Sequence, residues 1–388
     1  MRFRTRSRPG TILLAAAAAA AAVAVPASAA ASAQASPVVG HVYVNDNTPG
    51  TNTIGVFDRH ADGTLTPHAG SPFAAGGAGT GAGLASQGAL QISPDGRFML
   101  AVDAGSNQIS VLRIKPDGSL RLVPGGVASS GGVLPVSVAI HGGLVYVANA
   151  GAGGSNYTGF RLGPNGRLAP IAGSTVALPD GSQPGDVLFN STGRKLAGTR
   201  VGTSEIDSFT VSGSGLLTAA SGSPFPAQGL GPFGSEFRPT NPRQLFVSNA
   251  HNTGTGSGTV SAFHDSASGM LTSIGSSPFA DQQTAPCWVE ITHNGQFLFT
   301  VNTASGSVSR YSIAPGGALR LLGSTPIRGT SVGAVDARLS PDGRFLYLDE
   351  SGAVAVAAFA VHGGSLTALA SSPAALPTGA APAGIVVT

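Results

Sequence analysis

The sequence is poor in cysteine and in charge. Cys287 is its single cysteine, so no disulfide can form within the chain. Only 10% of the 388 residues are charged, and lysine occurs only at Lys115 and Lys195. Folding must therefore depend on packing and on backbone pairing, for which a chain of this length suffices.

Positive charge is concentrated at the start of the chain. The chain has a formal net charge of +3, and four positive charges come from Arg2, Arg4, Arg6 and Arg8. The remaining residues therefore carry a net charge that is slightly negative. Such a chain has no basic surface that could follow a phosphate backbone. We therefore predict that nucleic acid is not a partner.

Motifs for metal binding are missing as well. None of the eight histidines pairs with another at a ligand spacing such as H-x3-H. No EF-hand-like loop of the form D-x-[DN]-x-[DN]-G occurs either. These absences predict a protein without a metal site and without a cofactor.

One long apolar run occurs, at the start of the chain. It spans residues 11–25, follows the four arginines and precedes three A-x-A patterns, at Ala27–Ala29, Ala31–Ala33 and Ala33–Ala35. This order is typical of a secretory signal peptide, here over residues 1–35. An uncleaved membrane anchor is the alternative, but the run of 15 residues is shorter than the ~20 that a spanning helix needs. We predict a protein secreted from a bacterial cell, monomeric and without a membrane span after cleavage.

Glycine and proline, by contrast, are abundant, with 57 and 27 residues, and short apolar runs lie between them. Runs such as HVYVN, GLVYVAN, RQLFVSN, QFLFTVN and RFLYL recur in a unit of about 50 residues, a period typical of propellers and solenoids. The hexapeptide SPDGRF occurs at Ser93–Phe98 and again at Ser340–Phe345. Its Asp-Gly pair favours a tight turn between two strands.

Each unit contains four strand-like segments, the pattern of one propeller blade. We predict an all-β fold, a single seven-bladed β-propeller over residues 36–388 with four antiparallel strands per blade. Blade one lacks its own inner strand, and the terminal APAGIVVT, residues 381–388, is expected to supply it and close the ring. The glycine-rich residues 74–88 are expected to form a loop between blades. The predicted second strands are Val42–Val44, Phe98–Val102, Leu144–Ala148, Lys195–Thr199, Leu245–Ser248, Phe297–Val301 and Phe345–Asp349.

The repeated motifs resemble those of a known family. They are the SPDGRF hexapeptide, the hairpins DGTL at Asp62–Leu65 and DGSL at Asp117–Leu120, and the SPF segments at Ser71, Ser223 and Ser277. With them, residues 37–388 resemble the seven-bladed lactonase family, which includes bacterial 6-phosphogluconolactonases and fungal muconate-lactonising enzymes. The chain is also similar to the YVTN-type propellers of surface-layer proteins, through YVAN, FVSN and FTVN. The resemblance implies a propeller and lactone chemistry.

The chain departs from this family where the family's active-site motifs are expected. Gly234 stands where G-P-R-H has its histidine, and Ala250 stands where N-E has its glutamate. In blade four, Arg200 takes the place of the first aspartate of D-L-G-T-D-R, and Glu205 that of its arginine. Neither glycine nor alanine can act as an acid or base.

These departures favour a ligand- or protein-binding propeller at a surface, with a degenerate lactonase site. The alternative is a divergent hydrolase of a lactone or sugar-acid ester, with Arg200, Glu350 and Asp336 as catalytic residues. The expected ligand is a sugar acid or lactone, or else a protein or another cell-surface ligand.

Polar residues end all seven second strands, and we expect them to face the mouth of the central channel. The competing interpretation is that they only shape turns, because Asn and Asp readily bond to nearby backbone groups. Asp186, Trp288 and Asp336 near the starts of inner strands, and His251 beside Asn249, extend this candidate site. Asp186 is expected to pair with Arg200, and Trp288 to stack on a ligand or to pack in the core. The strand-end residues are Asp46, Asp103, Asn149, Arg200, Asn249, Asn302 and Glu350.

Overall fold

The computed structural model describes residues 1–3, 10, 36–328 and 333–388. The predicted signal peptide lies almost wholly outside the described residues and stays a prediction. Residues 36–388 form one unit by themselves. Among the described residues, no helix has the length and apolar character that crossing a membrane requires.

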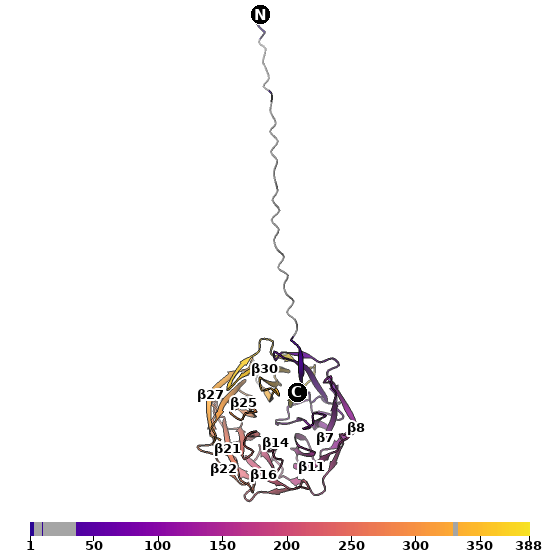
Figure 1. The fold of residues 1–388 in the computed structure, drawn as a ribbon, viewed down its shortest axis with the longest axis vertical. Coiled ribbons are helices and arrows are strands. Elements are labelled where there is room, and N and C mark those ends of the chain that lie inside the picture. Colours follow the sequence, from indigo (N-terminus) through magenta and orange to yellow (C-terminus); the bar gives the residue numbers. More distant parts are fainter. Residues whose placement is uncertain (4–9, 11–35, 329–332) are drawn as a thin grey trace. The chain divides into compact units, whose positions relative to one another are not determined.

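Seven antiparallel sheets surround a central channel, and each sheet is one blade (Figure 1). The all-β, seven-bladed prediction is confirmed. From blade one to blade seven, the inner strands are β33 (Ile385–Val387), β5 (Leu90–Ile92), β9 (Pro135–His141), β14 (Pro184–Phe189), β19 (Pro232–Phe237), β24 (Pro286–Ile291) and β28 (Ala334–Leu339).

The second strands coincide with the predicted apolar runs, because these runs are buried on both faces of a blade. They are β1 (Val38–Asn45), β6 (Phe98–Asp103), β10 (Leu144–Asn149), β15 (Lys195–Arg200), β20 (Gln244–Asn249), β25 (Phe297–Asn302) and β29 (Phe345–Glu350). The third strands are β2 (Thr53–His60), β7 (Gln108–Ile114), β11 (Asn156–Leu162), β16 (Glu205–Val211), β21 (Thr259–Asp265), β26 (Ser307–Ile313) and β30 (Ala355–His362).

The outer strands differ from the expected single segment. In blades two and six they are continuous, as β8 (Leu120–Ser129) and β27 (Leu319–Pro326). In the other five blades each outer strand consists of two short pieces, both paired with the third strand. The pieces are β3 (Leu65–Pro67) and β4 (Phe73–Ala74), β12 (Leu168–Pro170) and β13 (Val176–Ala177), β17 (Leu217–Ala219) and β18 (Phe225–Pro226), β22 (Leu271–Ser273) and β23 (Phe279–Ala280), and β31 (Ser365–Ala368) and β32 (Ala374–Ala375).

A serine between the two pieces explains these breaks, and in three of the five blades it belongs to an SPF segment. The hydroxyl of Ser71 accepts a 2.8 Å hydrogen bond from the backbone N–H of Val56 on the third strand, where a backbone carbonyl would otherwise accept. Ser277 does the same for Ala262, at 2.7 Å. A side chain thus replaces one backbone pairing, and the outer strand is interrupted there.

The C-terminal strand completes blade one, as predicted. β33 pairs antiparallel with β1, and Val44 lies opposite Ile385. The backbone N–H of Thr388 donates to the carbonyl of His41 at 2.9 Å. The side chain of Arg59 donates to the Thr388 carbonyl through both Nε and Nη2, at 3.0 and 2.9 Å. The ring is therefore closed by strand pairing between the two ends of the propeller.

SPDGRF forms the turn between the first two strands of blades two and seven. The hydroxyl of Ser93 donates to Asp95 and accepts a 2.9 Å hydrogen bond from the backbone N–H of Phe98. Ser340 makes the same two bonds in blade seven. The motif therefore shapes a turn, as predicted, and Asp95 serves that turn.

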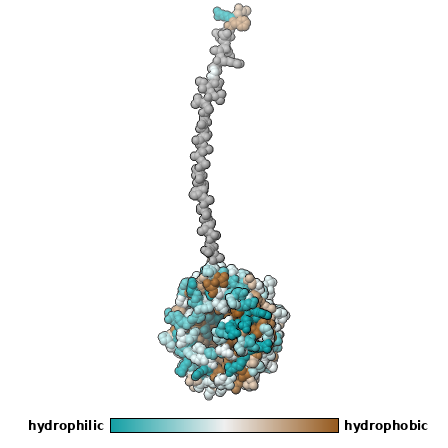
Figure 2. Space-filling view, turned by 45° about the vertical axis from the view of Figure 1, so that its right-hand side comes forward, coloured by the Kyte–Doolittle hydropathy of each residue, from teal (hydrophilic) through white to brown (hydrophobic). Residues whose placement is uncertain are grey.

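Tyrosines tie neighbouring blades together. Tyr43, Tyr146 and Tyr347 are fully buried in the second strands of blades one, three and seven. Each hydroxyl donates to a backbone carbonyl in a hairpin of the next blade, namely Gly118, Gly215 and Gly63. A hydrogen bond of this kind contributes about 1 kcal/mol. On the outside, Figure 2 shows a mostly hydrophilic face with scattered apolar residues.

Candidate functional site

The glycine-rich loop between blades one and two enters the central channel. The side-chain amide of Gln87 donates to the carbonyls of Ser235 and Val289, at 3.3 and 3.1 Å, and its oxygen accepts from the N–H of Val289 at 3.0 Å. Trp288 donates from Nε1 to the carbonyl of Ser86 at 2.8 Å. The loop was expected only to join two blades, but its end plugs the channel among the inner strands.

A pocket of about 290 Å³ lies in the channel next to this plug. Inner strands from blades two to seven contribute its walls, and Gln87 is part of the lining. Its size suits a small ligand, near the lower end of the usual range. The residues that line it are Gln87, Gln91, Ala139, Ile140, Asp186, Val187, Leu188, Phe189, Ser235, Glu236, Glu290, Ile291, His293 and Arg338.

Three charged side chains occupy matching positions around this pocket. Glu236, Glu290 and Arg338 lie on the inner strands of blades five, six and seven, each opposite the third residue of its second strand. Because a propeller repeats its blades around one axis, equal register brings them to one level of the channel. The fold therefore places two carboxylates and one guanidinium side by side.

Arg338 is the centre of this charge cluster. Its Nη1 lies 3.1 Å from Oε2 of Glu290 and 3.7 Å from Oδ1 of Asp336. The other oxygen of Glu290 accepts a 2.8 Å hydrogen bond from the backbone N–H of Leu339. Both oxygens of Glu290 are thus occupied, and this carboxylate is held in place.

Glu236 differs from Glu290 in having a free oxygen. Its Oε2 has no hydrogen-bond partner among the described residues, although it is enclosed by protein atoms. The residue as a whole is only partly buried and lines the pocket. A buried oxygen without a partner is costly unless water or a ligand reaches it. Glu236 is therefore the acid of this cluster whose carboxylate the protein leaves incompletely hydrogen-bonded.

The enclosed position of these acids shifts their titration. Burial raises the pKa of Asp186 to about 7, although Ser235 donates two hydrogen bonds to that carboxylate. Burial also raises the pKa of Glu236 well above its ordinary value, and the neighbouring Glu290 raises it further. The pKa of Glu290 is raised by burial despite the opposing effect of Arg338. Among these acids Asp186 has a pKa near neutrality, which suits a group that transfers a proton.

The structure brings two of the predicted site residues to this cluster. Asp186 lines the pocket, and Asp336 lies beside Arg338 and accepts a 3.2 Å hydrogen bond from the backbone N–H of Gly88. Sequence reasoning missed Glu236, Glu290 and Arg338 themselves. Each of them follows, by two residues, an inner-strand position named in the sequence analysis: Gly234, Trp288 or Asp336. Residues two apart in a strand point to the same side of the sheet.

The seven strand-end residues lie elsewhere. All are buried, with Arg200 at 8% exposure and the other six at 0%, so they do not face an open channel mouth as expected. None of them lines the channel pocket. Asp103 accepts a 2.9 Å hydrogen bond from Asn52, and Asn249 donates to the hydroxyls of Thr259 and Ser261. Bonds of this type fix strand ends, while a role in ligand binding stays a prediction for these residues.

The other strand-end residues show the same pattern of local contacts. Asn149 donates to Asn156, Asn302 donates to Ser307 and Ser309, and Asp46 accepts from Thr53. Glu350 ends β29 opposite Ala334 and is fully buried.

The expected ion pair between Asp186 and Arg200 is wrong. Arg200 binds Asp207 on the third strand of its own blade instead, through Nε and Nη2, each at 2.7 Å. The hydroxyl of Tyr157 donates to the same carboxylate at 3.0 Å. Asp207 lies on the strand paired with β15 and meets the guanidinium fork with both oxygens, which is the favoured geometry.

Trp288 and His251 also lie away from the pocket lining. Trp288 is 4% exposed and packs edge-to-face on Phe233, with ring centroids 5.2 Å apart, so the core interpretation describes its surroundings. His251 is exposed in the loop after β20.

Gly234 and Ala250 were predicted to replace two family residues, and the structure shows what surrounds them. A side-chain carbon on Gly234 would collide with the amide oxygen of Gln87 and would lie 2.6 Å from the carbonyl of Cys287. Ala250 is buried. Because residue 234 is a glycine, the channel has space for the side chain of Gln87.

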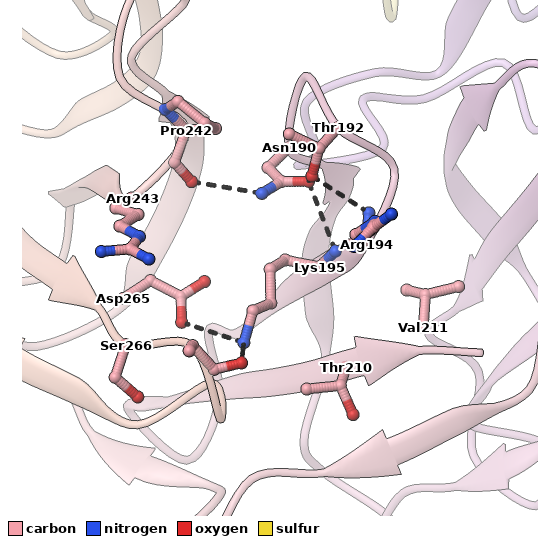
Figure 3. A pocket seen from close by; sticks show the side chains of 11 residues that line it. Asn190, Thr192, Arg194, Lys195, Thr210, Val211, Pro242, Arg243, Asp265 and Ser266 are labelled. Atoms are coloured by element: carbon pink, nitrogen blue, oxygen red, sulfur yellow. Dashed lines mark hydrogen bonds and ion pairs between the residues drawn. The ribbon is translucent and has the colours of Figure 1, made fainter.

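A second pocket, of about 400 Å³, lies between blades four and five (Figure 3). The ammonium group of Lys195 points at Asp265, 3.7 Å from Oδ1, and donates to the carbonyl of Ala267 at 2.6 Å. The lysine is therefore already engaged by the protein. The channel pocket is the better candidate for chemistry, because inner strands of several blades bring Asp186, Glu236 and Arg338 together in its lining.

Comparison with known proteins agrees with this fold. Residues 50–189 and 236–382 match the family described as lactonase, 7-bladed beta-propeller. The chain belongs to this lactonase family. No curated protein sequence matches this chain.

Solved structures of lactonase-type propellers are similar to it. A candidate 6-phosphogluconolactonase from Bacteroides uniformis has a TM-score of 0.71 at 19% identity, over 91% of this chain and 100% of that one. One from Bacteroides fragilis has a TM-score of 0.69 at 20% identity, over 92% and 99%. The periplasmic gluconolactonase of Pseudomonas aeruginosa has a TM-score of 0.70 at 18% identity, over 90% and 99%. At these identities the likeness shows the fold.

Proposed function

We propose that this lactonase-family protein hydrolyses a lactone of a sugar acid in its channel pocket. Family membership and the pocket chemistry support this activity over the binding role that the sequence favoured. The observation that carries the proposal is that Glu236, whose Oε2 has no hydrogen-bond partner among the described residues, lines the channel pocket together with Arg338.

Each chemical task of lactone hydrolysis has a candidate group in this pocket. The ionised form of Glu236, which its raised pKa shifts to higher pH, takes a proton from water, whose oxygen attacks the carbonyl carbon of the lactone. Arg338 stabilises the negative charge that develops on the carbonyl oxygen and then on the product carboxylate. Asp186, with its pKa raised to about 7, gives a proton to the ring oxygen as the ring C–O bond breaks. The product is an open hydroxy acid.

We place this activity outside the cytoplasm, on the strength of the leader-like residues 1–35. One of the proteins with a similar structure is itself a periplasmic gluconolactonase. Fractionation of cells that express the full chain tests this location, and a product found only in the cytoplasm, with its leader intact, would contradict it.

Proton release from a panel of sugar-acid lactones tests the activity. The expected result is turnover above the spontaneous rate, lost in Glu236→Gln. A matched control is Glu205→Gln, because Glu205 is a partly exposed residue of β16 outside the pocket lining. No turnover on any lactone, or equal turnover in Glu236→Gln, would overturn the proposal.

A further inference from the structure

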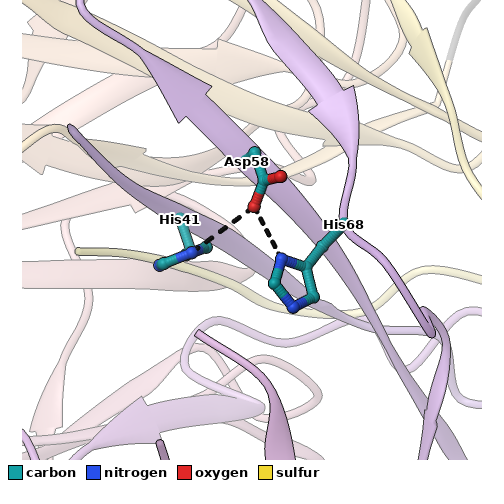
Figure 4. Close-up of side chains that lie close together, drawn as sticks. All are labelled: His41, Asp58 and His68. Carbon is teal, nitrogen blue, oxygen red and sulfur yellow. Dashed lines mark hydrogen bonds and ion pairs between the residues drawn. The ribbon is translucent and has the colours of Figure 1, made fainter. Parts of the chain in front are cut away.

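A second group of ionisable side chains lies on blade one and contributes nothing to the lining of the channel pocket. Oδ1 of Asp58 is 3.4 Å from Nε2 of His41 and 2.6 Å from Nδ1 of His68 (Figure 4). One potential ligand atom from each of the three side chains lies within 4.8 Å of the other two. The sequence predicted no metal site because the histidines lack ligand spacing, but here two strands and the segment after a third bring the side chains together.

The sheet fixes this arrangement. His41 on β1 lies directly opposite Asp58 on β2, and Thr66 on β3 lies opposite Asp58 from the other side. His68 follows β3, and its backbone N–H donates to the carbonyl of Val56 at 2.9 Å. Side chains on directly paired and diagonal positions of one sheet face come within contact distance. The three groups are therefore held by paired backbone and not by a free loop.

The donor atoms suit a transition-metal ion. Two imidazoles and a carboxylate form the kind of three-ligand set that holds Zn²⁺ with water in the fourth position. The side chains are 14%, 25% and 10% exposed for His41, Asp58 and His68, so solvent can still reach the group.

The distances fit an ion after a small adjustment. Ligand atoms of a tetrahedral zinc site lie about 3.3 Å apart, and the His41–Asp58 separation of 3.4 Å meets this value. The 2.6 Å between His68 and Asp58 is a hydrogen bond, in which the two groups share a proton. An ion would take the place of the hydrogen between the two groups, and the neutral ring would then carry its single proton on Nε2.

We propose that His41, Asp58 and His68 bind one divalent transition-metal ion, with Zn²⁺ as the natural choice. The ion joins β1, β2 and the segment after β3 of the blade that closes the ring. The backbone N–H of His41 also donates to the terminal Thr388, to its hydroxyl at 3.0 Å and its carbonyl at 3.3 Å. Binding therefore fixes the strand on which ring closure depends, and stabilises the folded protein by linkage.

Titration calorimetry of the chelator-treated, tag-free protein with zinc chloride tests this site. The expected result is a saturable heat that corresponds to about one zinc ion per chain. Magnesium chloride should give no binding, because Mg²⁺ prefers oxygen ligands. Zinc should also raise the Tm of the wild-type protein.

Two substitutions make the test specific. His68→Ala and Asp58→Asn should each weaken zinc binding by more than about tenfold and abolish the zinc-dependent rise in Tm. His60→Ala is the matched control, because His60 on β2 of the same blade bonds to Thr66 and Ser36 instead. If His68→Ala fails to fold, His68→Gln replaces it. Zinc binding that is absent in the wild type, or equally tight in both cluster variants, would overturn the proposal.

Discussion

Nη1 of Arg338 lies 3.1 Å from Oε2 of Glu290, so an ion pair joins the inner strands of blades six and seven inside the central channel. Arg338 also faces Asp336 at 3.7 Å, and Asp336 is fully buried. One guanidinium thus compensates two carboxylates that have little access to water.

Arg338→Met should destabilise the protein strongly. Loss of the guanidinium leaves the carboxylates of Glu290 and Asp336 buried without a counter-charge, which costs about 3–5 kcal/mol. Urea denaturation gives the change in the free energy of unfolding. Arg344→Met is the control, because Arg344 is 63% exposed and its pair with Asp342 spans 3.9 Å. The control should change stability by less than about 1 kcal/mol. Equal effects of the two substitutions would contradict the buried-pair argument.

Glu236→Gln should abolish most of the proposed lactone hydrolysis without unfolding the protein. Glutamine keeps the size of the side chain but cannot accept a proton, and a general base contributes about 10²–10⁴-fold to a rate. Steady-state kcat/KM, with circular dichroism to check folding, measures the effect. A variant that is folded and fully active would exclude Glu236 as the base.

Stability should fall as the pH rises from about 4 to about 7, in part because of Asp186. Its folded-state pKa is raised from the ordinary 3.8 to about 7, so in this range the folded protein holds a proton that the unfolded chain has released. The unfolded state then binds fewer protons, and the free energy of unfolding decreases with pH. This group alone contributes a slope of up to about 1.4 kcal/mol per pH unit.

Urea midpoints of wild type and Asp186→Asn at several pH values check this slope. The variant cannot ionise at position 186, so its stability should depend less steeply on pH than that of the wild type. Parallel curves would show that Asp186 does not hold its proton in the folded state.

Gly234→Ala should destabilise the protein through the plug of the channel. The added carbon would collide with the amide oxygen of Gln87 and would lie 2.6 Å from the carbonyl of Cys287. Overpacking of this type costs about 1–3 kcal/mol. In a chain that already carries Gln87→Ala, part of this cost should vanish, because one of the two obstacles is gone. A double-mutant cycle from thermal unfolding measures the coupling, and additive effects would refute the contact.

The architecture could be predicted from the sequence because each blade is specified by patterns of residues that are close together in the sequence. SPDGRF sets a turn through contacts within six residues, and the apolar second strands recur at one period. The terminal IVVT run also resembles an inner strand closely enough to predict ring closure. These signals need no knowledge of how distant segments meet.

The candidate site could be predicted only in part, because it depends on register between blades. Asp186 and Asp336 were recognised on inner strands, but Glu236 and Arg338 become neighbours only when the blades assemble around the channel. The place of Gln87 was missed for the same reason. Its partners are backbone groups more than 100 residues away, and no local pattern marks them. The group of His41, Asp58 and His68 likewise needs the strand pairing of blade one.

The pairing of β33 with β1 has a consequence for the order in which the protein forms. His41 and Thr388 are 347 residues apart and are hydrogen-bonded to each other. Blades two to seven each consist of one continuous stretch of chain and can form as soon as that stretch has been made. Blade one must wait for Ile385–Val387, which is made after all other strands of the propeller. Until then β1 presents an unpaired edge, which is a place where a chain can join to another copy of itself. The newly made propeller is therefore exposed to mispairing with other chains until Ile385–Val387 has been made.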